Sequence, residues 1–149
     1  MAMTSKINSK PVGVIGTGSF GTTIANILAA NSRVILYGRD KDQIEAMKTS
    51  RSHRGYALHE HIKPTNDITE VAAKCDVIFP SVSSSGFRSV IKQLSPHLHP
   101  YHMLIHGTKG MDISLRDGET LEQQSYLSRN EVKTMSEVIR DETVVVRVG

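Results

Sequence analysis

The sequence predicts an α/β fold: a doubly wound, mostly parallel sheet with helices on both of its faces. Two observations carry this prediction. Apolar runs of strand length alternate with amphipathic segments of helical period along most of the 149 residues. A glycine-rich turn, Gly16–Gly21, stands between the first apolar run and the first helical segment. Because parallel strands need a helix-sized connection between them, the alternation favours a parallel sheet.

The first half of this alternation fills residues 12–50. The predicted elements are a strand at Val12–Ile15, a helix from Ser19 to about Asn31, a strand at Arg33–Tyr37 and a helix at Lys41–Ser50. Asp40 is followed three residues later by Gln43, which is the pattern of an N-cap and a capping box. We therefore expect the second helix to begin directly after Asp40.

The alternation resumes after a polar stretch. We expect Arg51–Lys63 to be a surface connection, with at most a short strand near Ile62–Thr65. The predicted elements that follow are a helix at Asp67–Cys75, a strand at Asp76–Val82, a helix at Gly86–Leu94 and a strand at Met103–His106. Pro80 has no N–H to give to a central ladder, so its strand is expected to end or bulge there.

The last third of the chain has a weaker pattern. Asp112–Asn130 is polar and contains the turn signal Asp117-Gly118, so we expect a loop with some helix. A helix from Glu131 is predicted by the spacing of Val132, Met135, Val138 and Ile139. The β-prone run Thr143–Val148 predicts a final strand, in which Val144–Val146 is buried.

Composition excludes several classes of protein. The formal net charge is +3 and the charged fraction is 22%, which is too small an excess of cations for a nucleic-acid footprint. The first ten residues hold no apolar core of a secretory signal, and no later run has the length of a membrane span. A single cysteine, Cys75, fits a reducing compartment. We expect a cytoplasmic protein without nucleic-acid partners or stable membrane insertion.

The glycine-rich turn carries the first functional signal. Gly16-Thr17-Gly18-Ser19-Phe20-Gly21 has the spacing G-x-G-x-x-G between a strand and a helix. In that context Gly16 permits the tight turn, Gly18 lets a pyrophosphate approach the backbone, and Gly21 allows close helix–strand packing. The helix N-terminus then binds the phosphates. The competing interpretation is a turn that only reverses the chain; we favour dinucleotide binding by a Rossmann-type domain.

The end of the second strand addresses the choice between NAD and NADP. An acid about 20 residues after the first glycine would accept a hydrogen bond from the ribose 2′-hydroxyl of NAD. Counting from Gly16 reaches Leu36, and Arg39 is the first charged residue after it. An arginine pairs with a 2′-phosphate, so NADP(H) is slightly favoured over NAD(H). Asp40, which would support NAD, is read as a helix N-cap.

A lysine between two glycines follows the fifth predicted strand. In His106-Gly107-Thr108-Lys109-Gly110, Lys109 falls at the carboxyl edge of the sheet, where ligands of such folds bind. Its ammonium group suits a phosphate or a developing alkoxide. Taken alone, the same pattern also fits an exposed turn lysine.

Five segments in this order resemble one family. VGVIGTGSFGTTIANILA, GRD, SSSGFRSVI, HGTKGMD and TMSEVI are similar to the amino-terminal domain of NAD(P)-dependent glycerol-3-phosphate dehydrogenase. The resemblance implies NAD(P)H binding by residues 11–149, after a disordered polar tail at residues 1–10. It implies that the full enzyme, an oxidoreductase, interconverts dihydroxyacetone phosphate and glycerol 3-phosphate for phospholipid synthesis in lipid metabolism.

The resemblance also implies roles for single residues. Ser19, Phe20 and Arg39 become cofactor contacts, Phe87 lines the nicotinamide region, and Lys109 touches cofactor and substrate. The family's second, catalytic helical domain is expected to be absent from these residues, and the general base is expected beyond Gly149. We therefore expect no catalytic residue in this chain and no activity from it alone. Ser83 and Pro80 depart from the family pattern.

Two alternatives stay open. The chain fits a stand-alone NAD(P)-sensing module without catalysis, or the cofactor domain of another dehydrogenase of the same superfamily. A missing second domain would leave apolar surface uncovered, so we expect a homo-oligomer. No metal site is expected from the loop histidines, which are His59, His61, His97, His99 and His102. Cys75 is read as a buried apolar residue.

Overall fold

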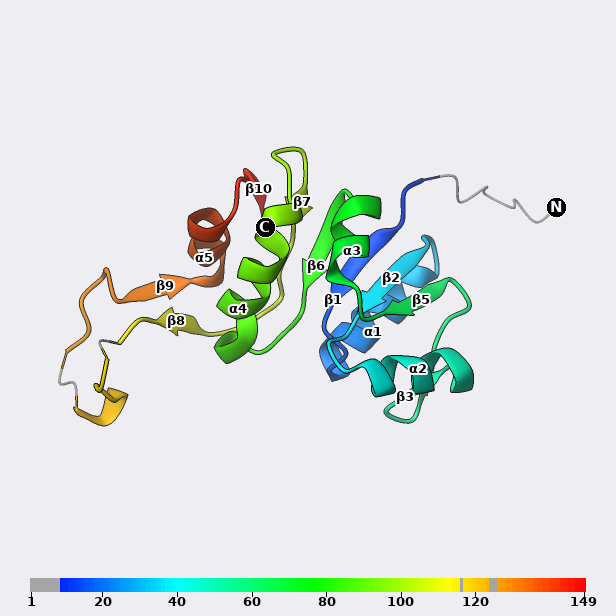
Figure 1. The fold of residues 1–149 in the computed structure, drawn as a ribbon, viewed down its shortest axis with the longest axis horizontal. Coiled ribbons are helices and arrows are strands. Elements are labelled where there is room, and N and C mark those ends of the chain that lie inside the picture. The colour runs from blue at the N-terminus through cyan, green and yellow to red at the C-terminus, as the bar shows by residue number, and fades with distance from the viewer. Residues whose placement is uncertain (1–8, 116, 124–125) are drawn as a thin grey trace.

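The computed structural model describes residues 9–115, 117–123 and 126–149, and its centre is a six-stranded sheet (Figure 1). The strand order is β10-β7-β6-β1-β2-β5, and every pair in it is parallel. The strands are β1 Val12–Ile15, β2 Val34–Tyr37, β5 Ile62–Thr65, β6 Val77–Pro80, β7 Met103–Leu104 and β10 Arg147–Val148. The predicted fold class is therefore confirmed.

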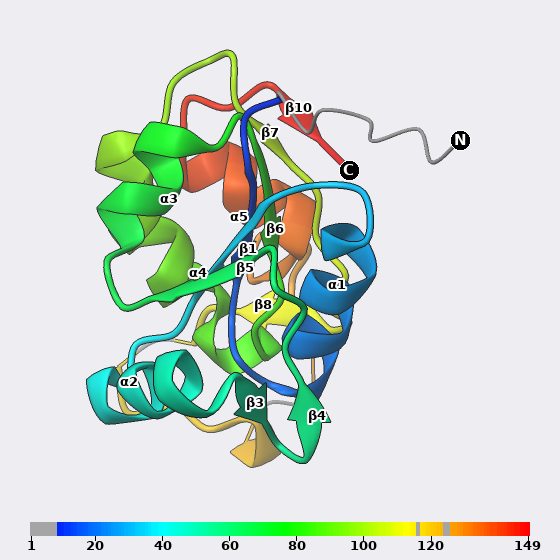
Figure 2. The same cartoon turned by 90° about the vertical axis from the view of Figure 1, so that its right-hand side faces the viewer.

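Helices cover both faces of this sheet (Figure 2). They are α1 Ser19–Ala29, α2 Lys41–Ser50, α3 Ile68–Lys74, α4 Ser84–Leu94 and α5 Met135–Glu142, with 3-10 turns at Ser95–His97 and Leu121–Gln123. Neighbouring strand residues point to opposite faces, so Val14 packs with α1 and α2 while Ile15 packs with α3, α4 and α5. Burial on both faces explains why the strands read as continuous apolar runs.

Most element boundaries match the predicted ones within about two residues, which is the usual uncertainty of helix and strand ends. Helix α2 has its predicted bounds, and β6 ends at Pro80 as expected. The capping box predicted at Asp40 is half right. The Asp40 carboxylate accepts a hydrogen bond from the Gln43 backbone N–H at 3.0 Å, but the Gln43 side chain accepts one from the Thr17 hydroxyl at 2.6 Å instead of reaching back.

The predicted surface connection at Arg51–Lys63 contains a hairpin that the sequence reading missed. Strands β3 (Ser52–His53) and β4 (Tyr56–Ala57) pair antiparallel. The two residues between them, Arg54 and Gly55, have φ values of 53° and 81°. Two consecutive left-handed residues form the tight loop whose twist matches a hairpin.

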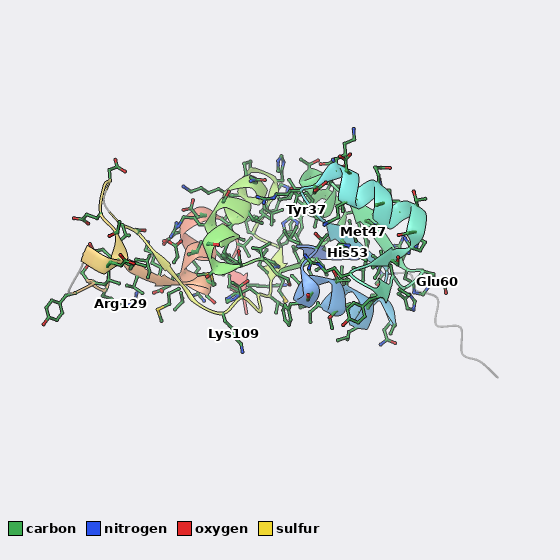
Figure 3. All side chains as sticks on the ribbon, turned by 90° about the horizontal axis from the view of Figure 1, so that it is seen from below. Tyr37, Met47, His53, Glu60, Lys109 and Arg129 are labelled. Carbon is green, nitrogen blue, oxygen red and sulfur yellow. The ribbon has the colours of Figure 1, made fainter. Side chains whose placement is uncertain are left out.

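A second antiparallel pair, β8 (Met111–Ile113) and β9 (Val132–Thr134), forms an arm that projects from the body of the domain in Figure 1. The prediction of a loop with some helix at Asp112–Asn130 is wrong for Asp112 and Ile113, which lie in β8, and holds for the described residues after them, which include the 3-10 turn Leu121–Gln123. Val132 lies in β9, so its assignment to a helix was wrong. Arg129, on this arm, lies at the opposite end of the molecule from Glu60 (Figure 3).

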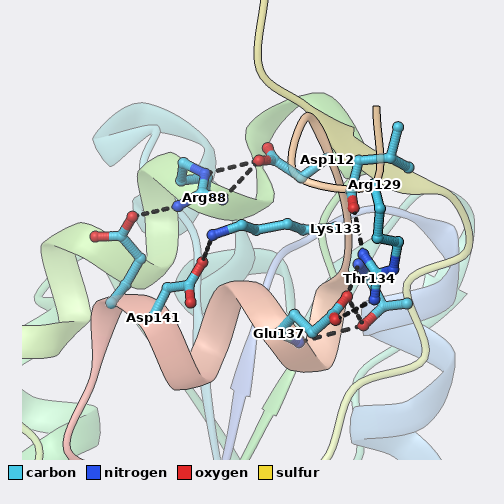
Figure 4. Close-up of polar contacts among 9 residues, drawn as sticks. Arg88, Asp112, Arg129, Lys133, Thr134, Glu137 and Asp141 are labelled. Atoms are coloured by element: carbon cyan, nitrogen blue, oxygen red, sulfur yellow. Dashed lines mark hydrogen bonds and ion pairs between the residues drawn. The ribbon is translucent and has the colours of Figure 1, made fainter. Parts of the chain in front are cut away.

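Helix α5 starts at Met135, four residues later than predicted, because Thr134 caps it. Thr134 and Glu137 form a reciprocal capping box, and hydrogen bonds from the Thr134 backbone and from Arg129 hold the pKa of Glu137 at about 2. Arg88 of α4 joins the arm to this helix (Figure 4): its Nε donates to Asp112 at 2.8 Å, and its guanidinium also pairs with Glu142. One arginine therefore connects α4, β8 and α5.

The final strand is shorter than predicted. Only Arg147–Val148 pairs with β7, and Val144 and Val146 are exposed, at 56% and 74%, while Val145 is buried. The chain turns after α5 because the Val145 N–H donates to the Thr143 hydroxyl at 3.1 Å. The prediction of a buried Val144–Val146 was therefore wrong for two of its three residues.

Residues 1–8 of the predicted N-terminal tail lie outside the described residues. Within the described part of the tail, Lys10 pairs with Asp76 at 2.9 Å. Over the described ranges, the helices are all too short or too polar to span a bilayer.

Candidate functional site

A cleft opens at the carboxyl ends of β1, β2 and β6, where the strand order reverses direction. β1 pairs with β2 on one side and with β6 on the other. The chain that leaves β1 continues through α1 on one face of the sheet, and the chain that leaves β6 continues through α4 on the opposite face. Ligands of open α/β sheets bind at such a switch point. The cleft has a volume of about 520 Å³, and Gly16, Gly18 and Arg39 line it.

Two glycines of the turn are required by close packing. Gly16 has φ +118°, and a Cβ there would lie 2.5 Å from the Ser81 carbonyl oxygen. A Cβ on Gly21 would lie 2.1 Å from the Gly16 carbonyl oxygen. Both distances are below any real contact of a Cβ atom, so the turn closes against β6 and α1 only with glycine at these positions.

Gly18 is different, because a Cβ there would meet nothing within 4 Å. Its φ of −68° is also open to any residue. Gly18 is the N-cap of α1, no side chain caps the helix, and its first turn holds no acidic residue. The free space beside Gly18 therefore faces uncapped N–H groups at the positive end of a helix, which is a site for an anion.

A second cleft, of about 480 Å³, adjoins the first and shares Gly18 with it. It brings Ser19 and Phe20 together with Lys109. The Phe20 ring lies against Gly107, where a Cβ would come within 2.6 Å of it. The Thr108 hydroxyl donates to the Val82 carbonyl at 2.8 Å, which fixes the loop after β7 beside the loop after β6.

Lys109 and Arg39 are both exposed, and among the described residues neither takes part in an ion pair. Lys109 extends outward from its loop (Figure 3). Arg39 directly follows Gly38 at the end of β2 and lines the first cleft. Its neighbour Asp40 caps α2, as predicted. The two cations thus line separate clefts, and no carboxylate among the described residues pairs with either of them.

The resemblance implies that Phe87 lines the nicotinamide region, and in the structure the residue belongs to the core. The side chain is fully buried in the core between the sheet and α4, and it lines neither cleft. Its ring meets the His106 ring edge-on, with centroids 5.5 Å apart. Phe87, Ile91 and Leu94 are the buried face of α4, so helical periodicity explains the position.

His106 connects this core to the loop that carries Lys109. Its Nε2 lies 3.0 Å from the Ser136 hydroxyl, and its Nδ1 has no partner among the described residues. Burial lowers the pKa of His106 below its ordinary value. The imidazole beside the Lys109 loop is therefore neutral at pH 7.

Sequence reasoning missed two residues of the first cleft's rim. His53 Nε2 donates to the Thr17 carbonyl at 2.8 Å, and Arg54 Nε donates to the same oxygen at 3.2 Å. Arg54 also lines the first cleft. The Arg54-Gly55 dipeptide was the available signal, because glycine after a polar residue marks a hairpin loop.

His102 and Cys75 have structural roles. His102 is fully buried; it accepts from the His99 N–H at 2.8 Å and donates to the Ala72 carbonyl at 3.0 Å. Burial raises the pKa of Cys75 to about 12, as expected for an apolar environment. Within residues 9–115, 117–123 and 126–149, no three His, Cys, Asp or Glu side chains are grouped as metal ligands.

Comparison with known proteins identifies the family to which the chain belongs. Residues 11–148 match the family described as NAD-dependent glycerol-3-phosphate dehydrogenase N-terminus. Glycerol-3-phosphate dehydrogenase [NAD(P)+] of Teredinibacter turnerae is 35% identical over 147 residues, which is 95% of this chain and 38% of the relative. The enzyme of the same name from Pseudomonas putida KT2440 is 37% identical over 145 residues, 94% of this chain and 38% of the relative. The chain spans about two fifths of the length of these relatives.

Solved structures agree on the fold. A glycerol-3-phosphate dehydrogenase from Coxiella burnetii has a TM-score of 0.72 at 23% identity, over 94% of this chain and 39% of that one. A ketopantoate reductase from Ralstonia eutropha has a TM-score of 0.65 at 16% identity, over 93% of this chain and 39% of that one. Because the fold is shared by enzymes with different substrates, sequence rather than shape separates the families.

Proposed function

Since the chain belongs to the NAD-dependent glycerol-3-phosphate dehydrogenase N-terminus family, we propose that its residues 11–149 are the NAD(P)H-binding domain of such a dehydrogenase. The full reaction would move a hydride between C4 of the nicotinamide and C2 of the triose phosphate, and a proton to or from the C2 oxygen, which interconverts dihydroxyacetone phosphate and glycerol 3-phosphate. We do not assign a general base to this chain. Its own contribution is to hold the cofactor and to present Lys109.

One observation carries the proposal: the space beside Gly18 is open and faces the uncapped N-terminus of α1. A turn that only reversed the chain would have no reason to keep glycine at a position where any side chain fits. A pyrophosphate needs that space, because it must approach the backbone N–H groups closely. The neighbouring glycines, Gly16 and Gly21, are explained by packing alone, so they do not distinguish a dinucleotide-binding turn from a turn that only reverses the chain.

Lys109 is the residue we propose to touch both cofactor and substrate. Its loop is held by Thr108 and by the contact of Phe20 with Gly107, so the ammonium group stands at the second cleft, next to the glycine turn. A fixed positive charge there would attract a substrate phosphate and stabilise negative charge that develops on the C2 oxygen. Ser19 and Phe20 would contact the cofactor from the other wall.

Calorimetric titration of the chain with NADPH and with NADH tests the cofactor proposal. We expect saturable binding with a dissociation constant below about 1 mM, which corresponds to a binding free energy of at least about 4 kcal/mol. Lys109→Ala should weaken binding, whereas Lys92→Ala, which removes an equally exposed lysine from α4, should not. Absence of saturable binding by the wild-type chain would refute the proposal.

We further propose a cytoplasmic protein that self-associates. Exposed apolar side chains support the second point: Phe20 in the first turn of α1 is 53% exposed, and Met111 in β8 is 57% exposed. Sedimentation velocity at rising concentration measures this directly. A monomer at every concentration would contradict self-association and leave the cofactor proposal intact.

A further inference from the structure

Arg54 is a second arginine of the first cleft, and the glycine-turn motif does not account for it. Arg39 reaches the cleft from the end of β2, and Arg54 reaches it from the loop between β3 and β4. The lining contains both arginines, and none of the described residues that line it is an aspartate or glutamate. The cleft therefore has two cations and no carboxylate to balance them.

The hydrogen bond of Arg54 leaves most of its guanidinium group free. Nε donates to the Thr17 carbonyl at 3.2 Å, and His53 Nε2 donates to the same oxygen at 2.8 Å. Over the described part of the chain, no ion pair or other hydrogen bond uses the two terminal nitrogens of Arg54. The side chain is thus attached to the glycine turn while its forked end remains available to a ligand.

The backbone of Arg54 gives an independent reason to look for a role. Its φ is 53°, in the left-handed region, and it occupies the first position of a two-residue hairpin loop. That position favours asparagine, aspartate or glycine, because they adopt positive φ most readily. Residues held in such conformations gather at ligand sites.

We propose that Arg54 and Arg39 together bind the 2′-phosphate of NADPH, so that two elements of the chain set the cofactor preference. The inference rests on the proposed dinucleotide function. A phosphate monoester offers three oxygens and nearly two negative charges, enough for two guanidinium groups. NADH offers only a 2′-hydroxyl, and the described lining gives that hydroxyl no carboxylate acceptor.

The decisive variant is Arg54→Asn, because it removes the guanidinium group while supplying a residue that the loop favours. Loss of the hairpin is therefore not expected, and circular dichroism with thermal melting checks this. Arg33→Ala is the matched control: Arg33 precedes the amino end of β2, opposite the cleft, and hydrogen-bonds the Ser9 carbonyl at 3.0 Å. The ligands are 2′,5′-ADP and 5′-AMP, which differ only in the 2′-phosphate.

We expect the wild-type chain to bind 2′,5′-ADP about 10- to 100-fold more tightly than 5′-AMP, the range for charge-assisted hydrogen bonds. Arg54→Asn should reduce this ratio by about 5- to 20-fold, as should Arg39→Ala, whereas Arg33→Ala should leave it unchanged.

The outcomes separate this inference from the function on which it rests. If Arg54→Asn leaves the ratio unchanged, or weakens both ligands equally, Arg54 does not contact the 2′-phosphate and the inference is wrong, while dinucleotide binding stands. If the wild-type chain binds neither adenosine phosphate nor NADPH, the proposed function itself fails and the inference fails with it. A selective loss in both cleft variants supports the arginine pair.

Discussion

Adding a side chain at Gly18 should strongly weaken dinucleotide binding without destabilising the fold, and adding one at Gly21 should destabilise the fold. The structure gives opposite surroundings to these two glycines. A Cβ on Gly18 would meet nothing within 4 Å, whereas a Cβ on Gly21 would lie 2.1 Å from the Gly16 carbonyl oxygen. Gly18→Val and Gly21→Ala therefore separate the two roles that one motif combines.

The magnitudes follow from these surroundings. Gly18→Val adds its methyl groups to the space through which a phosphate would reach the N-terminus of α1. The loss of one or two charge-assisted hydrogen bonds there amounts to about 1.5–3 kcal/mol, or about 10- to 150-fold in affinity. Gly21→Ala must move backbone against backbone, at a cost of about 1–3 kcal/mol. In a chain of this size that lowers Tm by about 2–12 °C.

Thermal melts and NADPH titrations on both variants and the wild type measure the two effects. The expected pattern is a normal Tm with weak binding for Gly18→Val, and a lowered Tm for Gly21→Ala. Gly18→Ser, which supplies a good N-cap, controls for any loss of helix stability at that position. If Gly18→Val binds NADPH like the wild type, the open space is not the route of the pyrophosphate and the reasoning is refuted.

Three further results are expected. Two lysines hold the pKa of Glu70 at about 2, below its ordinary 4.5, so the stabilisation from this carboxylate is present above pH 4.5 and is lost as the pH falls through 2. Glu70→Gln should therefore lower the free energy of unfolding by about 1 kcal/mol at pH 7 and by nothing near pH 2. Equal costs at both pH values in urea titrations would contradict the assignment. Arg88→Met leaves two carboxylates without their cation and should lower the free energy of unfolding by about 1–3 kcal/mol. Lys10→Met breaks an exposed pair and should lower it by less than about 0.5 kcal/mol. Coinciding thermal melts of the two variants would contradict this prediction. Burial raises the pKa of Cys75 to about 12, so a thiol reagent at pH 8 should modify it only after denaturant is added, and rapid reaction of the folded chain would show that the side chain is accessible.

The residues that sequence reasoning placed correctly are those whose constraints are local. Gly16 and Gly21 are fixed by a positive φ or by a carbonyl oxygen a few residues away, and Asp40 caps the helix that starts beside it. Such constraints are visible as spacing, because the interacting residues are close together in the chain. The order of strands and helices was predictable for the same reason.

The residues that it misplaced depend on contacts between distant segments. Strands β8 and β9 are separated by residues 114–131, and each has three residues, too few for an alternation to be recognised. The Arg54 hairpin has the same difficulty, since its strands contain two residues each.

The unequal lengths of the strand pairings make the two halves of the sheet differ in local stability. β1 pairs with β2, and β2 with β5, over four residues each, whereas β7 is joined to β6 and to β10 over two. Native-state hydrogen exchange should therefore find slow, globally protected amides in β1 and β2 and earlier sub-global opening around β7 and β10. The glycine turn and Arg39 follow the long pairings, and Lys109 follows a short one. We therefore expect the proposed dinucleotide-binding part of the site to be rigid before any ligand binds, and the strand that leads into the lysine loop to open earlier.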